Sequence, residues 1–180
     1  MSISGKEVAL VLSDHFDANE FNSLHNCFSQ AGALVSIVGD AAGQKLMDWN
    51  RTTEVTIEVG FEEARSYDFD AIVISNGYSP DKIRVNEAAR SLVLDMFNSG
   101  KVIGVIDHGI QVLITLGILK GKSVTGSPSI KVDIENAGAK YFNEPVVVDG
   151  NLVSGRGLDD VKAFCNAVID ELRRLTEFVA

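Results

Sequence analysis

The chain has 180 residues, of which 46% are hydrophobic and 23% are charged, a balance typical of globular proteins rather than disordered ones. The 16 basic and 25 acidic side chains give a formal net charge of -9. Such a surface repels phosphate backbones, so we expect no nucleic-acid partner. The longest apolar runs are too short to span a bilayer, so we also expect no membrane contact.

Buried strands alternate with helices along the chain. Continuous apolar runs, which are typical of strands buried on both faces, occur at Val8–Leu12, Ala33–Val38, Phe69–Ser75 and Val102–Ile106. Apolar residues at helical spacing predict helices at Asn19–Ala31, about Asn86–Asn98, from His108 onward, near Ser129–Ala137 and over Leu158–Leu175. The alternating segment Gln44–Val59 indicates a hairpin or an edge excursion.

The last third of the chain carries shorter strand signals, near Ser123–Thr125, Ala139–Tyr141, Val146–Asp149 and Leu152–Ser154. The Asp-Gly-Asn turn between the last two favours a hairpin, because these residues tolerate positive φ. Strands that alternate with helices predict an α/β fold with a doubly wound, mostly parallel sheet and helices on both faces. We expect a single domain over residues 1–180, because no repeat or linker interrupts the pattern.

Both cysteines, Cys27 and Cys165, lie in helix-like segments and in no Cys-x-x-Cys pattern. In such positions a cysteine is most often a small buried hydrophobe. No charged and apolar leader is visible at the start of the sequence. We therefore expect a reducing, cytoplasmic location.

Polar side chains gather in three loops that follow predicted strands. In sheets of this kind the ligand crevice lies beyond the carboxyl ends of the strands, so these loops define the candidate site. The loop residues are Asp14, His15, Asp17 and Glu20 after the first strand, Asn76, Gly77, Ser79 and Asp81 after the third, and Asp107 and His108 after the fourth.

Asp107 lies between a buried strand and a helix start that contains Gly109, which is the layout of a nucleophile elbow. The elbow position needs a strained backbone, and aspartate is among the non-glycine residues that best tolerate positive φ. The amides at a helix N-terminus also favour an anion there. The pattern alone equally allows Asp107 to be an ordinary N-cap.

Five segments together carry a family resemblance. They read LSDHFDANEF, DAIVISNGYSPDKIRVNEAAR, GKVIGVIDHGIQVLITLGILKGK, IKVDIENAGAKY and VVVDGNLVSGRG. In order and spacing they resemble the PfpI/ThiJ family of the class I glutamine amidotransferase-like superfamily, over about residues 6 to 175. The resemblance implies a flavodoxin-like sandwich of the nucleophile-elbow type, with relatives among intracellular proteases, deglycases and stress-response proteins.

The family's elbow reads cysteine, histidine, glycine. His108 and Gly109 match the second and third positions, and Asp107 stands where the family has its cysteine. The family's Pro-Gly-Gly loop supplies an amide to an oxyanion hole, and here that loop reads Ser75-Asn76-Gly77. The resemblance therefore implies Asn76, Gly77 and Gly109 as binding residues.

Acidic residues complete the site that the resemblance implies. The acid that hydrogen-bonds the family's cysteine matches Glu20, with Asp17 as the rival. The acid that pairs with the histidine comes from a neighbouring subunit in PfpI-type oligomers, and its match is Asp81. We therefore expect a homo-oligomer, a dimer or hexamer, in which Asp81 is donated across the interface.

Two further residues are binding candidates. His15 lies in a polar loop at the crevice rim, where an exposed histidine is the simpler interpretation. Arg156 matches a family arginine near the pocket mouth, although a plain salt bridge would explain it as well.

The carboxylate at Asp107 governs the function that we expect. A carboxylate is a weak nucleophile beside a thiolate, so cysteine-type peptidase or deglycase activity should be absent. We expect a non-catalytic member, in which Asp107 resembles an oxidised cysteine, and we expect no cofactor. The alternative is a hydrolase, hydratase or lyase that acts on a small electrophile, with Asp107 or Glu20 as nucleophile or acid/base.

Two other hypotheses stay open. His15, Glu20, Asp107 and His108 are metal-ligand types, but nothing in their spacing enforces a metal site, and we expect no metal. A vestigial pocket in a structural oligomer would also fit. If family geometry holds, Glu20 approaches Asp107, the two carboxyl groups share a proton, and the pKa of one lies well above its usual value.

Overall fold

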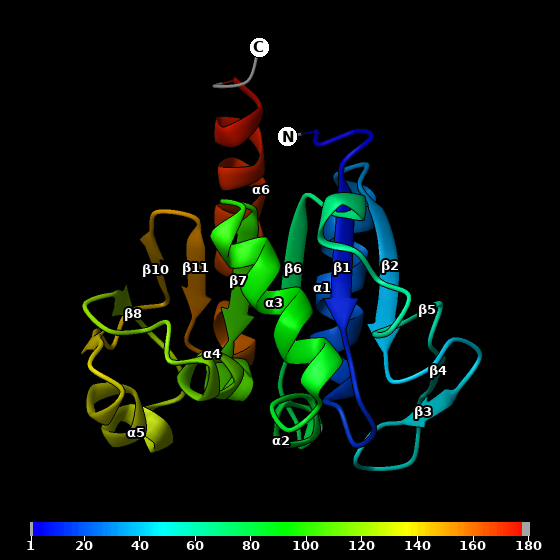
Figure 1. Cartoon of the computed structure of the whole chain (residues 1–180), viewed down its shortest axis with the longest axis horizontal. Coiled ribbons are helices and arrows are strands. Elements are labelled where there is room, and N and C mark those ends of the chain that lie inside the picture. The colour runs from blue at the N-terminus through cyan, green and yellow to red at the C-terminus, as the bar shows by residue number, and fades with distance from the viewer. Residues whose placement is uncertain (1, 178–180) are drawn as a thin grey trace.

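The computed structural model describes residues 2–177 and is built on a seven-stranded sheet (Figure 1). The seven strands are β1 (Glu7–Val11), β2 (Leu34–Gly39), β5 (Val59–Gly60), β6 (Ala71–Ile74), β7 (Val102–Ile106), β10 (Val146–Asp149) and β11 (Leu152–Gly155). Their order is β10-β11-β7-β6-β1-β2-β5. Only the β10–β11 pair within this sheet is antiparallel, so the sheet is mostly parallel, as predicted.

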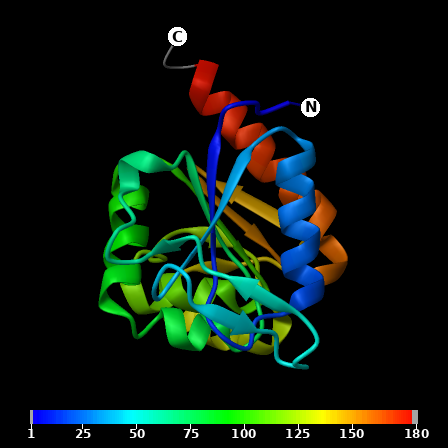
Figure 2. The same ribbon diagram turned by 90° about the vertical axis from the view of Figure 1, so that its right-hand side faces the viewer.

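Helices cover both faces of this sheet. The helices are α1 (Ala18–Gln30), α2 (Ser79–Ile83), α3 (Glu87–Asn98), α4 (Ile110–Leu116), α5 (Lys131–Asn136) and α6 (Val161–Glu177). Figure 2 shows α1 and α6 together on one side of the sheet and α3 on the other. The flavodoxin-like doubly wound architecture is therefore confirmed. Within residues 2–177, no helix is both long and apolar enough to cross a membrane.

The alternation of side chains along the strands divides the core into two halves. In β1, Val8 and Leu10 pack with the α1 and α6 side, while Ala9 and Val11 pack with the α3 and α4 side. Both sets are almost completely buried. This two-sided burial explains why the strand reads as a continuous apolar run rather than an alternating one.

Short elements lie around the main sheet. The Gln44–Val59 segment forms the predicted hairpin, from β3 (Lys45–Met47) and β4 (Glu54–Thr56), and then supplies the edge strand β5. A second small sheet pairs β8 (Ser123–Val124) with β9 (Lys140–Tyr141). The segment after β6 was expected to be a loop, but its second half is α2, which begins with a serine and a proline at its first positions.

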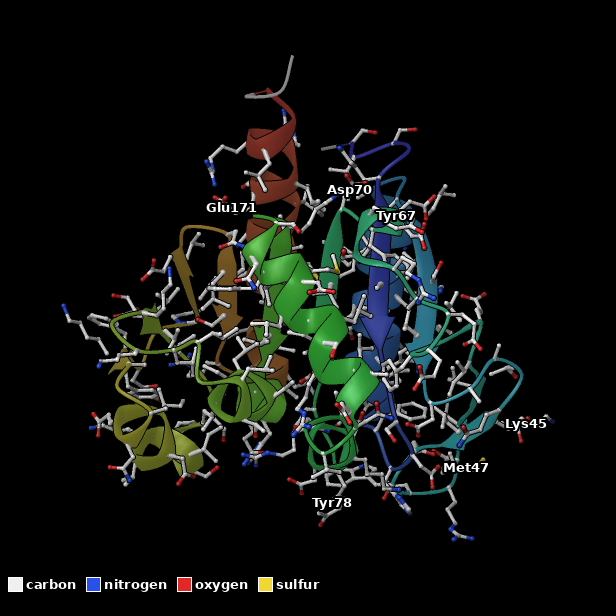
Figure 3. The ribbon with its side chains drawn as sticks, viewed as in Figure 1. Lys45, Met47, Tyr67, Asp70, Tyr78 and Glu171 are labelled. Carbon is white, nitrogen blue, oxygen red and sulfur yellow. The ribbon has the colours of Figure 1, made fainter. Side chains whose placement is uncertain are left out.

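The carboxyl ends of the strands meet at one edge of the sheet. Figure 3 shows Tyr78, in the loop after β6, at this edge, while Asp70 lies at the opposite one. Isolated bridges join Phe16 to Asp48 and to Gly77. These bridges hold the loops after β1, β3 and β6 together, so the candidate site is formed by loops that are fastened to each other.

Candidate functional site

Asp107 occupies a strained backbone position directly after β7, with φ of 55°. Its Oδ1 lies 2.6 Å from Nδ1 of His108, and its Oδ2 accepts a hydrogen bond of 3.0 Å from Nδ2 of Asn76. No side-chain capping bond closes the 3-10 turn Asp107–Gly109 or α4. Asp107 is therefore an elbow residue, and the N-cap interpretation is wrong.

Close backbone packing explains the glycines around this elbow. A Cβ atom on Gly109 would clash with the carbonyl oxygen of Ile74 at the end of β6. An ideal Cβ on Gly157 would lie 3.3 Å from Oδ2 of Asp107, which is a tight contact. The turn after β7 therefore depends on glycine at position 109, while a side chain at position 157 would press on the Asp107 carboxylate.

Glu20 lies in the first turn of α1 and is completely buried. Asp17 is the N-cap of this helix, and its Oδ1 accepts a hydrogen bond of 3.0 Å from the backbone N–H of Glu20. Asp17 therefore holds the helix start, and Glu20 is the acidic side chain that is completely buried behind it. The two roles that the sequence left open are separated in this way.

The Glu20 carboxyl group is held in an unusual environment. Its Oε1 accepts a hydrogen bond of 2.7 Å from the backbone N–H of Asn76, whereas its Oε2 has no partner among the described residues. Burial raises the pKa of Glu20 well above its usual value of 4.5, the charge of Asp107 raises it further, and the Asn76 hydrogen bond opposes both. The protonated form of Glu20 is therefore favoured far more than it is in a solvent-exposed glutamate.

The expected hydrogen bond between Glu20 and Asp107 is not formed. Both oxygens of Asp107 accept hydrogen bonds from other groups, and the one partner of Glu20 in the described part of the chain is the Asn76 amide. Asn76 connects the two acids, since its backbone reaches Glu20 and its side chain reaches Asp107. The shared proton was therefore a wrong prediction, whereas the predicted rise in the pKa of one of the two acids is found at Glu20, and the charge of Asp107 contributes to it.

His108 continues the hydrogen-bonded chain toward solvent. Its Nε2 lies 3.3 Å from Oγ of Ser129, and the ring is partly exposed. The hydrogen bond to Asp107 raises the pKa of His108, desolvation partly opposes it, and the charges of Asp107 and Asp81 add to the increase. The imidazolium form is thus favoured beside the Asp107 carboxylate.

Asp81 lies on α2, and its side chain is largely exposed. Its nearest cationic partner is Arg84, whose Nη1 lies 3.9 Å away. Within one chain Asp81 acts on His108 through its charge, while the hydrogen bond to the imidazole comes from Asp107.

Two of the predicted binding residues have other partners. Nδ1 of His15 lies 3.2 Å from Nζ of Lys82 and 3.4 Å from Oδ2 of Asp14. Arg156 donates from Nε to Asp160 at 2.9 Å, which is the plain salt bridge that the sequence also allowed. No group of three or more metal-ligand side chains is arranged to hold an ion within residues 2–177, so the four-residue metal hypothesis has no support.

Gly77 has a structural role that the sequence did not show. Its φ is 85°, and a Cβ there would lie 2.7 Å from the backbone nitrogen of Asp17. Only glycine combines this conformation with such a close approach. The residue therefore allows the loop after β6 to pack against the loop that leads into α1.

Ser129 and Gly157 belong to the site and were missed by the sequence analysis. Ser129 reaches His108 from the turn before α5, and Gly157 borders Asp107 from the loop after β11. The VSGRG segment was quoted for its arginine, but its second glycine is the residue that approaches the elbow.

With this geometry established, comparison with known proteins defines the family. Residues 6–171 match the DJ-1/PfpI family, and the chain belongs to that family. It is 35% identical over 161 residues to general stress protein 18 of Bacillus subtilis, covering 89% of this chain and 94% of that protein. It is 34% identical over 160 residues to protein/nucleic acid deglycase 2 of Escherichia coli, covering 88% and 93%.

Solved structures show the same fold. A two-domain protein from Anabaena variabilis, with DJ-1/ThiJ/PfpI-like and ferritin-like domains, superposes with a TM-score of 0.90 at 35% identity. The match covers 93% of this chain and 48% of that one, so this chain spans about half of the two-domain protein. Drosophila melanogaster DJ-1beta superposes with a TM-score of 0.85 at 22% identity, covering 99% and 98%.

Proposed function

We propose that this chain is a DJ-1/PfpI family member in which Asp107 occupies the position of the nucleophilic cysteine, and that it acts as a non-catalytic, stress-type protein. The observation that carries the proposal is the elbow itself. Asp107 has the strained φ of 55° at the tip of β7, and His108 and Gly109 follow it. A relative at 35% identity is named a general stress protein.

The hydrogen bonds of Asp107 support a non-catalytic role. Each of its carboxylate oxygens is engaged, one by His108 and the other by Asn76. A carboxylate is already a weak nucleophile beside a thiolate, and two hydrogen bonds stabilise its charge further. A carboxylate and a cysteine sulfinate share one negative charge and two acceptor oxygens, so Asp107 resembles a permanently oxidised elbow cysteine.

One observation favours the alternative of acid/base chemistry. Glu20 is a buried carboxyl group whose raised pKa favours the protonated form, and its Oε2 has no partner within the described residues. A neutral acid with a free oxygen can donate a proton to a small bound electrophile. In this alternative the chain is a hydrolase, hydratase or lyase, with Glu20 as the proton donor and Asp107 as nucleophile or base.

A gain-of-function substitution tests the main proposal. The wild-type protein should show no glyoxalase, deglycase or peptidase turnover, and Asp107→Cys should introduce measurable turnover with small aldehydes, because it restores the thiol at the elbow. Asp107→Asn is the matched control, since it keeps the size of the side chain without a thiol. Robust wild-type turnover that survives Asp107→Ala would overturn the proposal.

Covalent labelling separates the alternative from the main proposal. Wild-type protein is incubated with small aldehydes, imines or isonitriles and digested, and the peptide that contains Asp107 is analysed by mass spectrometry. A covalent adduct on the Asp107 carboxylate that is lost in Glu20→Gln would support carboxylate chemistry. Unmodified Asp107 together with absent turnover would support the non-catalytic role.

We also propose that the chain self-associates in the cytoplasm as a dimer or hexamer, with Asp81 close to His108 of a second copy. Trp49 and Tyr78 support this proposal, because they form an aromatic pair that is largely exposed beside α2, with ring centroids 6.2 Å apart. Light scattering coupled to size-exclusion chromatography should give a multiple of the chain mass. A monomer at micromolar concentration would contradict it.

A further inference from the structure

The only two cysteines of the chain meet on the face of the sheet away from α3. Cys27 lies on α1 and Cys165 on α6, and these helices pack against each other (Figure 2). The two side chains lie close enough for each thiol to shift the pKa of the other. Cys165 is completely buried and belongs to the core on this face, against which Cys27 packs. Cys165 is therefore a small buried hydrophobe, as the sequence predicted, while Cys27 is only partly buried.

The two thiols differ in their access to solvent. Cys27 is partly exposed and lines a groove of about 420 Å³ between the two helices, together with side chains such as Asn26 and Gln30 of α1 and Lys162 and Asn166 of α6. A small molecule in the groove can therefore reach Cys27. Cys165 is completely buried and does not line this groove.

The interaction between the two thiols also shifts their pKa values in opposite directions. It lowers the pKa of Cys27, in spite of partial burial, because the Cys165 thiol donates to the developing thiolate. The same contact and burial raise the pKa of Cys165, and the nearby Glu20 adds to the increase. The accessible cysteine is thus the better nucleophile, and its buried neighbour is a protonated thiol in contact with it.

We propose that Cys27 and Cys165 form a peroxide-reactive dithiol, which small hydroperoxides oxidise to a disulfide that joins α1 to α6. The Cys27 thiolate attacks the terminal oxygen of the hydroperoxide, the O–O bond breaks, and the alcohol leaves with a proton. The resulting Cys27 sulfenic acid is attacked by the Cys165 sulfur, the S–O bond breaks, and the hydroxyl leaves as water with the Cys165 proton. Two thiols and one hydroperoxide therefore give one disulfide, one alcohol and one water.

This inference is independent of the elbow proposal. Neither cysteine takes part in the hydrogen-bonded chain of Glu20, Asn76, Asp107 and His108. The two thiols would be oxidised reversibly on the α1–α6 face, and this reaction does not depend on the function of Asp107.

The experiment uses the native, reduced wild-type protein. It is treated with a few equivalents of hydrogen peroxide or cumene hydroperoxide, then alkylated under denaturing, non-reducing conditions and digested. We expect the mass of the chain to fall by about 2 Da, as for loss of two hydrogens, and a linked peptide that contains both Cys27 and Cys165. Reduction should restore two alkylatable thiols.

Two variants test the division of roles. Cys165→Ser should stop at the Cys27 sulfenic acid, which a dimedone-type probe traps, while Cys27→Ser should leave Cys165 at least tenfold slower to react. Circular dichroism checks that each variant is folded. The peroxide experiment on the wild-type protein does not depend on either variant. Unchanged thiols, a disulfide between two chains, or a Cys27 sulfinic acid beside a free Cys165 would each overturn the proposal.

Discussion

Replacing Glu20 by glutamine removes a buried proton-binding group and nearly preserves its shape. The wild-type side chain is completely buried, and its pKa is raised mainly by burial and secondly by the charge of Asp107. Glutamine keeps an oxygen that can accept the hydrogen bond from the Asn76 amide. The substitution therefore isolates the titration of this group from its packing.

The sign of the effect follows from proton linkage. Below the usual pKa of 4.5, Glu20 is protonated in both the folded and the unfolded chain and contributes no pH dependence. Above it the unfolded chain loses the proton while the folded chain keeps it, so stability is lost as pH rises toward the folded-state pKa. The loss is about 1.4 kcal/mol per pH unit for one proton.

At pH 7.5 this contribution has an upper limit. That pH lies three units above the usual value, so a Glu20 that stays protonated throughout costs the wild type about 4 kcal/mol relative to low pH. The Glu20→Gln variant lacks this term. We expect the free energy of unfolding of this variant, relative to that of the wild type, to rise between pH 5.5 and 7.5 by at most about 1.4 kcal/mol per pH unit.

Urea unfolding followed by circular dichroism at several pH values provides the measurement. The control is Glu62→Gln, at a glutamate that is exposed to solvent, which should leave the difference between variant and wild type constant with pH. Parallel curves for wild type and Glu20→Gln would refute the reasoning, because they would mean that the folded chain ionises Glu20 as readily as the unfolded one.

Three further predictions concern the elements that support the site. Asp17→Ala should cost roughly 1 kcal/mol of unfolding free energy, because it removes the N-cap of α1. Gly77→Ala should cost roughly 1–3 kcal/mol more than Gly43→Ala in urea unfolding, because both have positive φ but only Gly77 meets neighbouring backbone; equal costs would contradict the close packing. In an NMR titration the pKa of His108 should lie above 6.5 and fall in Asp107→Asn, since the hydrogen bond to Asp107 is the largest cause of its increase.

Most of the fold could be predicted because its strands are buried on both faces. The predicted strand Val102–Ile106 has the bounds of β7, and the first strand is shifted by a single residue. The helix α2 was missed for a physical reason. Five residues that begin Ser-Pro are too few to show helical periodicity, and they read equally well as a turn.

The site could be predicted only where a topological rule applies. Asn76 and Asp107 follow neighbouring parallel strands, so their loops had to meet at one edge of the sheet. Ser129 lies in a turn that follows none of the main strands, and no such rule brings it to the elbow. The contact between Cys27 and Cys165 depends on the rotation of two helices about their axes, and sequence periodicity defines that rotation too coarsely.

The charges and hydrogen-bond donors around the elbow explain how an aspartate can occupy it. In the proposed comparison a thiolate with one negative charge is replaced by a carboxylate with one negative charge. The Asn76 side chain and the His108 ring donate to that carboxylate, and the imidazolium form of His108 offsets its charge. A second anion would be costly in this partly buried site, and the raised pKa of Glu20 means that its charged form is disfavoured there. An anionic side chain at position 107 that has a donor at each oxygen, beside an acid whose charged form is disfavoured, is therefore compatible with this elbow geometry.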